Sequence, residues 1–204
     1  NNLVLNSGGA EITLSGAAFN LGSGSLTTTG DINLANNVSI TATGGMTIND
    51  KIDADSASSN DRTLTLNSGT GSTIFAVGNI GASQALAGLT VTQSKGASFS
   101  GSVDVSDSSS GTITLTDTTD GADIAFVDVT ADTFTTAAQG YDIFLNGDAT
   151  FANAVTFQNT GTLDLGNATS DTLTFNGGLT ENTTGNVTID GAIVSSDDAI
   201  SFGN

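Results

Sequence analysis

The sequence contains no cysteine, proline, tryptophan or histidine, and these absences exclude several kinds of site. Without cysteine there is no disulfide and no thiolate metal ligand, and without cysteine or histidine there is no ordinary zinc site. Nucleophilic catalysis of the Ser-His-Asp or Cys-His kind also lacks its base. We therefore expect a protein that is not an enzyme.

Positive charge is almost as scarce. The only cations are Lys51, Arg62 and Lys95, against 21 acidic residues, so the net charge is −18. Nucleic-acid binding needs clustered cations that displace phosphate counterions, and an anionic membrane surface would repel this chain. No apolar run approaches the roughly 20 residues of a membrane-spanning helix. We expect neither a nucleic-acid partner nor membrane insertion by this segment.

What the sequence does contain is a short apolar-polar-apolar unit that recurs along the whole chain among Thr, Ser, Asn, Gly and Asp. Alternation with a period of two places both apolar side chains on one face of a strand. A single unit is too small to bury that face, so the units must stack on one another. Clear examples begin at Leu3, Ile12, Ile32, Leu64, Ile113, Leu163, Leu173 and Val187.

The spacing of the units favours a right-handed parallel β-helix, also called a β-solenoid. Successive units are about 10 to 15 residues apart, so two or three strands make a coil of roughly 20 to 30 residues, which is a solenoid-like period. The alternative is an antiparallel β-sandwich. It is favoured by three dipeptides that often form hairpin turns, Asp120-Gly121, Asn146-Gly147 and Asp190-Gly191.

No linker or change of composition divides the chain. We expect residues 1–204 to form a single β-solenoid segment, a fragment of a longer repetitive chain, because the repeating pattern continues to both ends. Two stretches, residues 84–96 and 128–140, are interpreted as loops or longer coils because their spacing is irregular.

Several stretches carry a family resemblance: residues 30–34 (GDINL), 64–71 (LTLNSGTG), 86–92 (LAGLTVT) and 185–191 (GNVTIDG). They resemble the repeats of filamentous-haemagglutinin-like and autotransporter-type bacterial exoproteins. The resemblance implies a right-handed β-helical shaft that is secreted to the bacterial surface or the extracellular space. It also implies a structural or adhesive role in a fibre or surface layer. Expected partners are the protein itself, end to end or laterally, and the surfaces or glycans of host or neighbouring cells.

The alternative function is a polysaccharide-binding or polysaccharide-cleaving β-helix. Glycoside hydrolysis needs two carboxylates at a set separation, and candidates are Asp104, Asp107, Asp117 and Asp128. With no tryptophan and a single tyrosine there is little aromatic surface on which sugar rings can stack. We therefore interpret these residues as solvated aspartates of turns, and assign no catalytic or cofactor-binding residue.

Calcium is the one cofactor that the sequence suggests. Asp117, Asp120 and Asp123 place three carboxylates around Gly121, and calcium prefers such an oxygen-rich environment. The spacing matches neither an EF-hand loop nor the nonapeptide of calcium-binding β-rolls. Diffuse screening of the negative charge by divalent ions is the simpler interpretation.

The ten phenylalanines lean toward the second half of the chain, which predicts stacked aromatic contacts between successive coils. Phe144 lies between Ile143 and Leu145, so its side chain is expected to point outward. There it is covered by a loop or contacts another chain.

Overall fold

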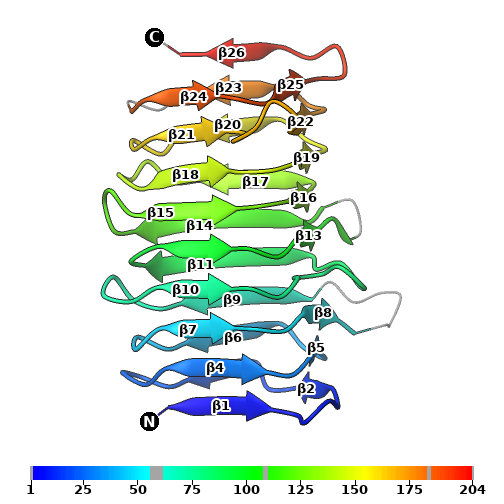
Figure 1. Cartoon of the computed structure of the whole chain (residues 1–204), viewed down its shortest axis with the longest axis vertical. Helices are drawn as coiled ribbons and strands as arrows, with labels where there is room; N and C mark the ends of the chain where they lie inside the picture. The colour runs from blue at the N-terminus through cyan, green and yellow to red at the C-terminus, as the bar shows by residue number, and fades with distance from the viewer. Residues whose placement is uncertain (1, 56–61, 108–109, 183–184, 204) are drawn as a thin grey trace.

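The structure is a computed structural model that describes residues 2–55, 62–107, 110–182 and 185–203. Within these residues every regular element is a β-strand and every pairing between strands is parallel. The strands stack in coils to give a β-solenoid of about eight turns, as Figure 1 shows. The predicted β-helix is confirmed, and the antiparallel sandwich is wrong.

Each coil passes through three faces, which we call A, B and C. Face A is a nine-stranded sheet. In order along the axis its strands are β1 (Leu3–Asn6), β4 (Leu26–Thr29), β7 (Met46–Ile48), β10 (Ile74–Ala76), β12 (Ala97–Phe99), β15 (Asp123–Phe126), β18 (Asp142–Leu145), β21 (Leu163–Leu165) and β24 (Val187–Ile189).

Face B consists of a three-stranded and a five-stranded sheet. Isolated parallel bridges join Ile80 to Ile52 on one side and to Val103 on the other, so the stack continues between the two sheets. The strands are β2 (Ile12–Leu14), β5 (Ile32–Leu34) and β8 (Ile52–Ala54), and then β13 (Val103–Val105), β16 (Val129–Ala131), β19 (Ala149–Phe151), β22 (Thr172–Phe175) and β25 (Ala192–Val194).

Face C is the second nine-stranded sheet. Its strands are β3 (Ala18–Asn20), β6 (Val38–Thr41), β9 (Thr63–Asn67), β11 (Gly88–Ser94), β14 (Thr112–Thr118), β17 (Thr133–Thr136), β20 (Val155–Phe157), β23 (Leu179–Glu181) and β26 (Ile200–Phe202). Strands β11, β16 and β17 lie within the two stretches interpreted as loops or longer coils, so the loop interpretation is wrong.

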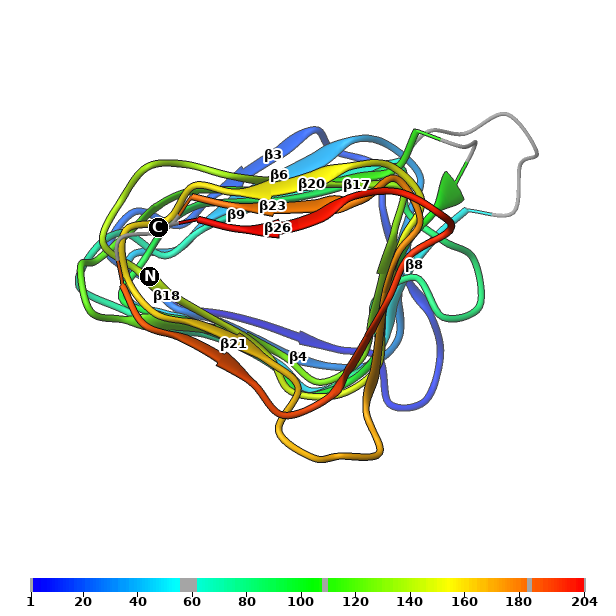
Figure 2. The ribbon, with the colours of Figure 1, turned by 90° about the horizontal axis from the view of Figure 1, so that it is seen from above.

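Seen along the axis, the three faces enclose a triangular interior (Figure 2). As the chain rises in Figure 1, front strands such as β10 run to the right and rear strands such as β11 run to the left. A coil that rises in this sense is right-handed, which is the preferred hand for crossovers between parallel strands.

Coil length varies while the register of the strands is kept. Ile124 pairs with Ile143, nineteen residues later, whereas Met46 pairs with Ile74, twenty-eight residues later. The chain between β8 and β9 has more residues than the chain between β16 and β17. Corners can therefore change in length without moving the inward side chains off their columns.

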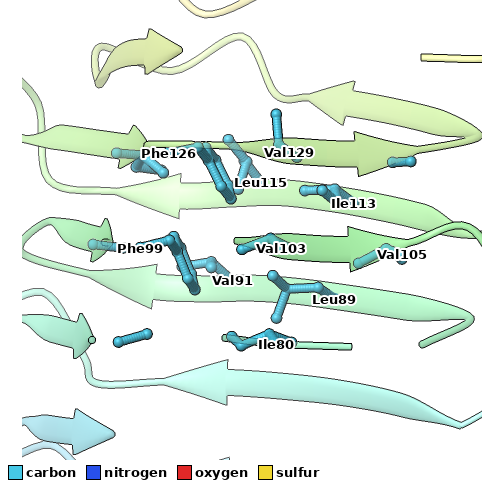
Figure 3. Close-up of a cluster of buried hydrophobic side chains, with 14 of the residues drawn as sticks. Ile80, Leu89, Val91, Phe99, Val103, Val105, Ile113, Leu115, Phe126 and Val129 are labelled. Carbon is cyan, nitrogen blue, oxygen red and sulfur yellow. The ribbon is translucent and has the colours of Figure 1, made fainter. Parts of the chain in front are cut away.

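One hydrophobic core fills the interior along the axis. In β9, Leu64 and Leu66 are fully buried and the Thr65 side chain between them faces outward, as the alternation predicted. Figure 3 shows side chains from all three faces, such as Leu89, Phe99 and Val103, pointing into the same interior. Burial of about 0.8 kcal/mol per methylene group, repeated in every coil, stabilises the stack.

Phenylalanines of successive coils contact one another inside the core. The Phe99 and Phe126 rings are stacked, with centroids 4.7 Å apart and an interplanar angle of 6°. Phe134 meets Phe126 edge-on at 5.9 Å and continues the contacts to Phe151 at 5.2 Å. The predicted aromatic stacking between coils is confirmed.

The three dipeptides that suggested hairpins lie at corners of the coil instead. Asp120-Gly121 joins β14 on face C to β15 on face A, and the φ of Gly121 is +69°, a conformation that favours glycine. Asn146-Gly147 joins β18 to β19, and a Cβ on Gly147 would overlap the carbonyl oxygen of Val127 in the preceding coil. Turn residues alone do not distinguish a reversal of the chain from a corner.

Tyr141, the only tyrosine, is fully buried where the chain passes from face C to face A. Its hydroxyl accepts a hydrogen bond from the Ala137 N–H at 2.9 Å, and the Leu115 carbonyl oxygen lies 3.1 Å away as an acceptor. Burial raises the pKa of Tyr141 to about 12, and the hydrogen bond from Ala137 lowers it only partly.

We expect the Tyr141 phenol to ionise near pH 12 in the folded protein, against 10.0 for an exposed tyrosine. Because the folded pKa is the higher one, this contribution to stability is complete below pH 10 and is lost as the pH rises to about 12. Tyrosinate absorbance followed against pH measures the midpoint. Urea unfolding should show that Tyr141→Phe removes this part of the alkaline loss. A midpoint near 10.0 in the folded protein would contradict the buried position.

Candidate functional site

The calcium candidates lie around the corner between β14 and β15. Asp117 is on the face C side, where its Oδ2 accepts a hydrogen bond from Gln93 Nε2 at 3.1 Å. Asp120 is in the turn, and its Oδ1 accepts from the Gly140 N–H of the next coil at 3.1 Å. Asp123 begins β15 on face A and is exposed. Two of the three carboxylates thus already accept hydrogen bonds from the protein.

The described residues contain no group of three or more acidic side chains that could together hold a metal ion. The corner therefore does not gather Asp117, Asp120 and Asp123 into one cage of ligands. A specific calcium site at these residues remains a prediction.

The candidate catalytic carboxylates are distributed differently. Asp104, on the outward side of β13, accepts hydrogen bonds from the Ser106 N–H at 3.1 Å and the Ser106 hydroxyl at 2.6 Å. Asp104 and Asp128 line a hollow of about 260 Å³ on face B, together with Asp148 of the next coil. Asp107 and Asp117 do not line this hollow.

Many corner carboxylates and amides share one structural role: each caps a backbone N–H of the next coil. Asp128 Oδ1 accepts from the Asp148 N–H at 3.1 Å, and Asp148 Oδ1 accepts from the Thr172 N–H at 2.8 Å. Asp142 caps Thr162 in the same way, and Asn79 caps Ser102 at 3.0 Å. Backbone N–H groups need partners where the ladder is interrupted, so much of the aspartate and asparagine content is explained by the corners.

Asp128→Ala should lower the free energy of unfolding by about 1 kcal/mol, because the Asp148 N–H loses its acceptor. Asp128→Asn keeps an acceptor oxygen and should change stability by less than about 0.5 kcal/mol. Urea denaturation of the two variants measures the difference. Equal losses in both would show that the charge, rather than the cap, is what matters.

Two of the three cations are paired with aspartates. Lys51 Nζ lies 3.0 Å from Asp53 Oδ2, and the Arg62 guanidinium binds both oxygens of the Asp55 carboxylate. Asp53 is only 5% exposed, and its Oδ1 also accepts from the Ser83 N–H at 2.9 Å. Burial acts to raise the pKa of Asp53, but the hydrogen bonds from Ser83, Lys51 and Gln84 outweigh it, so the pKa is lowered. The Arg62–Asp55 pair thus joins the residue after β8 to the residue before β9, and Asp53 joins β8 to the next coil.

A second hollow, of about 290 Å³, lies on the outer side of face A around β12. Its lining includes Phe75, Lys95 and Asp123. Outside the first and last coils, the exposed large hydrophobic side chains of the described residues are all on or beside this face: Phe75, Val77 and Val127. Phe144 also points outward here, paired with Ala125 on one side and Asp164 on the other, and is partly covered.

Sequence reasoning singled out Phe144 but not this hollow. Phe75, Lys95 and Asp123 belong to three successive coils, so their proximity depends on coil lengths that the sequence does not give. A sequence signal for the hollow is the pair of small outward residues in and beside β12, Ser98 and Ser100.

No protein-family model matches the chain, and neither the curated proteins nor the solved structures give a match. No helix in the described part of the chain is long and apolar enough to cross a membrane.

Proposed function

We propose that this chain forms part of the shaft of a secreted bacterial surface protein, with a structural or adhesive role and no catalytic activity. The observation that carries the proposal is the unbroken parallel stack. Two faces pair nine strands each, and one core runs along the axis. At about 4.8 Å per strand, nine strands span roughly 40 Å.

Such a stack is suited to a mechanical role. Parallel pairing directs the backbone hydrogen bonds along the long axis, and each coil contacts mainly its two neighbours. Length can therefore be added coil by coil without a new fold. Stiffness of this kind needs no cofactor.

The surface charge supports a shaft that stays apart from its neighbours. With 21 acidic residues against three cations, two copies repel each other in low salt. Divalent cations would screen that repulsion and let shafts approach side by side.

The last coil supports continuation of the stack at its open side. Ile189, Ile200 and Phe202 lie on inward columns, yet they are 43%, 37% and 40% exposed. Apolar side chains and the free edges of β24, β25 and β26 are complementary to another coil of the same kind. A coil of a second copy, stacked end to end, would cover them.

Labelling of intact cells of the source bacterium tests the proposed location. An antibody raised against the solenoid should bind intact cells as strongly as permeabilised ones. Labelling that needs permeabilisation would contradict the proposal.

Polysaccharide cleavage is the competing function, and the face B hollow with Asp104, Asp128 and Asp148 is the observation that favours it. A screen for new reducing ends in neutral and acidic polysaccharides, with and without calcium, separates the two. We expect no release. Release that is abolished by Asp128→Asn, a variant that keeps the cap, would replace the shaft proposal with an enzyme.

A further inference from the structure

The hollow on face A lies where two neighbouring strands, β12 and β15, carry small outward residues beside the larger Phe75 of β10. Ser98 of β12 pairs with Phe75 of β10 on one side and with Ala125 of β15 on the other. All three of these residues line the hollow. At about 290 Å³ the hollow is near the lower end of the range of small-molecule sites, roughly 300–1,000 Å³.

Three residues that line the hollow each lack one kind of partner among the described residues. The Phe75 ring is 50% exposed and has no aromatic partner among the described residues. In that same part of the chain Lys95 is the one cation without an ion pair. The Asp123 carboxylate accepts no hydrogen bond there, unlike Asp120 in the same corner and Asp142, the register partner of Asp123 in the next coil, which both cap backbone N–H groups.

An exposed aromatic ring, an ammonium donor and a carboxylate acceptor around one hollow match the chemistry of a sugar. The C–H face of a pyranose packs on an aromatic ring, while its hydroxyls accept from an ammonium and donate to a carboxylate. Ser98, whose hydroxyl lies 3.4 Å from that of Ser100, is a further lining residue with a donor and acceptor group. We propose that this hollow binds a neutral pyranose residue of a glycan.

The charges argue for a neutral ligand. An anionic sugar would meet Asp123 inside the hollow and a net charge of −18 around it. A cationic ligand would meet Lys95. A neutral sugar can form hydrogen bonds with both Lys95 and Asp123, and neither residue repels it.

The sugar site would add a specific ligand on face A to the structural role of the proposed shaft. The two can fail separately, because the shaft depends on strand pairing and the sugar site depends on outward side chains only. Binding through one shallow hollow should be weak, and tight adhesion would need many copies along a surface.

Backbone amide NMR titration of the chain with methyl glucoside, methyl galactoside and methyl mannoside at tens of millimolar tests the site. We expect at least one glycoside to shift the amides of residues 73–75, 95–98 and 123–125. Phe75→Ala should weaken that binding about fivefold, since it removes the stacking contact. Val77→Ala is the control, because Val77 is similarly exposed beside the same face but does not line the hollow. Lys95→Gln and Asp123→Asn should each weaken glycoside binding more than Val77→Ala does.

Absence of shifts with all three glycosides would overturn the proposal, as would tighter binding of a uronate such as methyl glucuronoside. Binding that Phe75→Ala leaves unchanged, or that Val77→Ala weakens as much, would place any sugar contact elsewhere. Phe75 is on the outside, so its replacement should keep the fold, and unchanged circular dichroism of the variant confirms this.

Discussion

A chain lacking residues 124–142 should fold into the same rod, shorter by one rise of about 4.8 Å. The deletion joins Asp123 to Ile143, and Ile143 already pairs with Ile124 in the register of face A. Strand β18 then replaces β15 above β12, and the inward columns stay aligned. Because each coil contacts mainly its neighbours, removing a whole coil leaves the other interfaces of the solenoid intact.

The matched control deletes residues 124–133, about half a coil. It would bring β17, a face C strand, into face A and shift every later strand off its column. We expect this variant to lose cooperative unfolding, whereas the whole-coil deletion keeps it. Thermal unfolding by circular dichroism distinguishes the two. Equal loss in both variants would contradict the modular stack.

Phe126→Ala should lower the free energy of unfolding by about 3–5 kcal/mol. The Phe126 side chain is fully buried, stacks on Phe99 of the preceding coil at 4.7 Å and meets Phe134 of its own coil edge-on, so its removal leaves a cavity between the two coils. Urea denaturation measures the loss.

Phe75→Ala is the matched control, since it makes the same substitution on the outer side of the same face. It should change stability by less than about 1 kcal/mol. A small effect of Phe126→Ala, or similar effects of the two substitutions, would contradict the assignment of Phe126 to the inner side of face A and of Phe75 to its outer side.

The alternation of apolar and polar residues was enough to predict the strands and their inward faces. The unit Ile113-Thr114-Leu115 lies in β14 with both apolar side chains buried, and the other units used for the prediction are strands too. Stacking followed from the small size of each unit. These features depend on residues that are neighbours in the chain, so they can be predicted from the sequence.

Which strands pair, and what the corners do, depend on distant parts of the chain. Asp120-Gly121 suits a hairpin and a corner equally, and the choice is made by β12 and β18, which offer edges to β15 on both sides. The apolar spacing in residues 128–140 is irregular in part because Thr136, a polar residue, occupies an inward column there. Its hydroxyl accepts a hydrogen bond from the Gln158 N–H at 2.7 Å.

The candidate sites show the same limit. Asp117, Asp120 and Asp123 are close in sequence, but the corner separates them onto two faces and gives Asp120 a backbone N–H to cap. Conversely, Phe75, Lys95 and Asp123 are distant in sequence and share one hollow. Chemistry that depends on coil length cannot be located from residue spacing alone.

Nuclear Overhauser contacts between backbone protons of successive strands measure the parallel stack most directly. The stack predicts contacts from Ala97 to Ile74 and to Ile124, and from Ile124 to Ile143, the partners one coil away on face A. Close contacts between α-protons of β14 and β15 across Asp120-Gly121, as in an antiparallel hairpin, would contradict it.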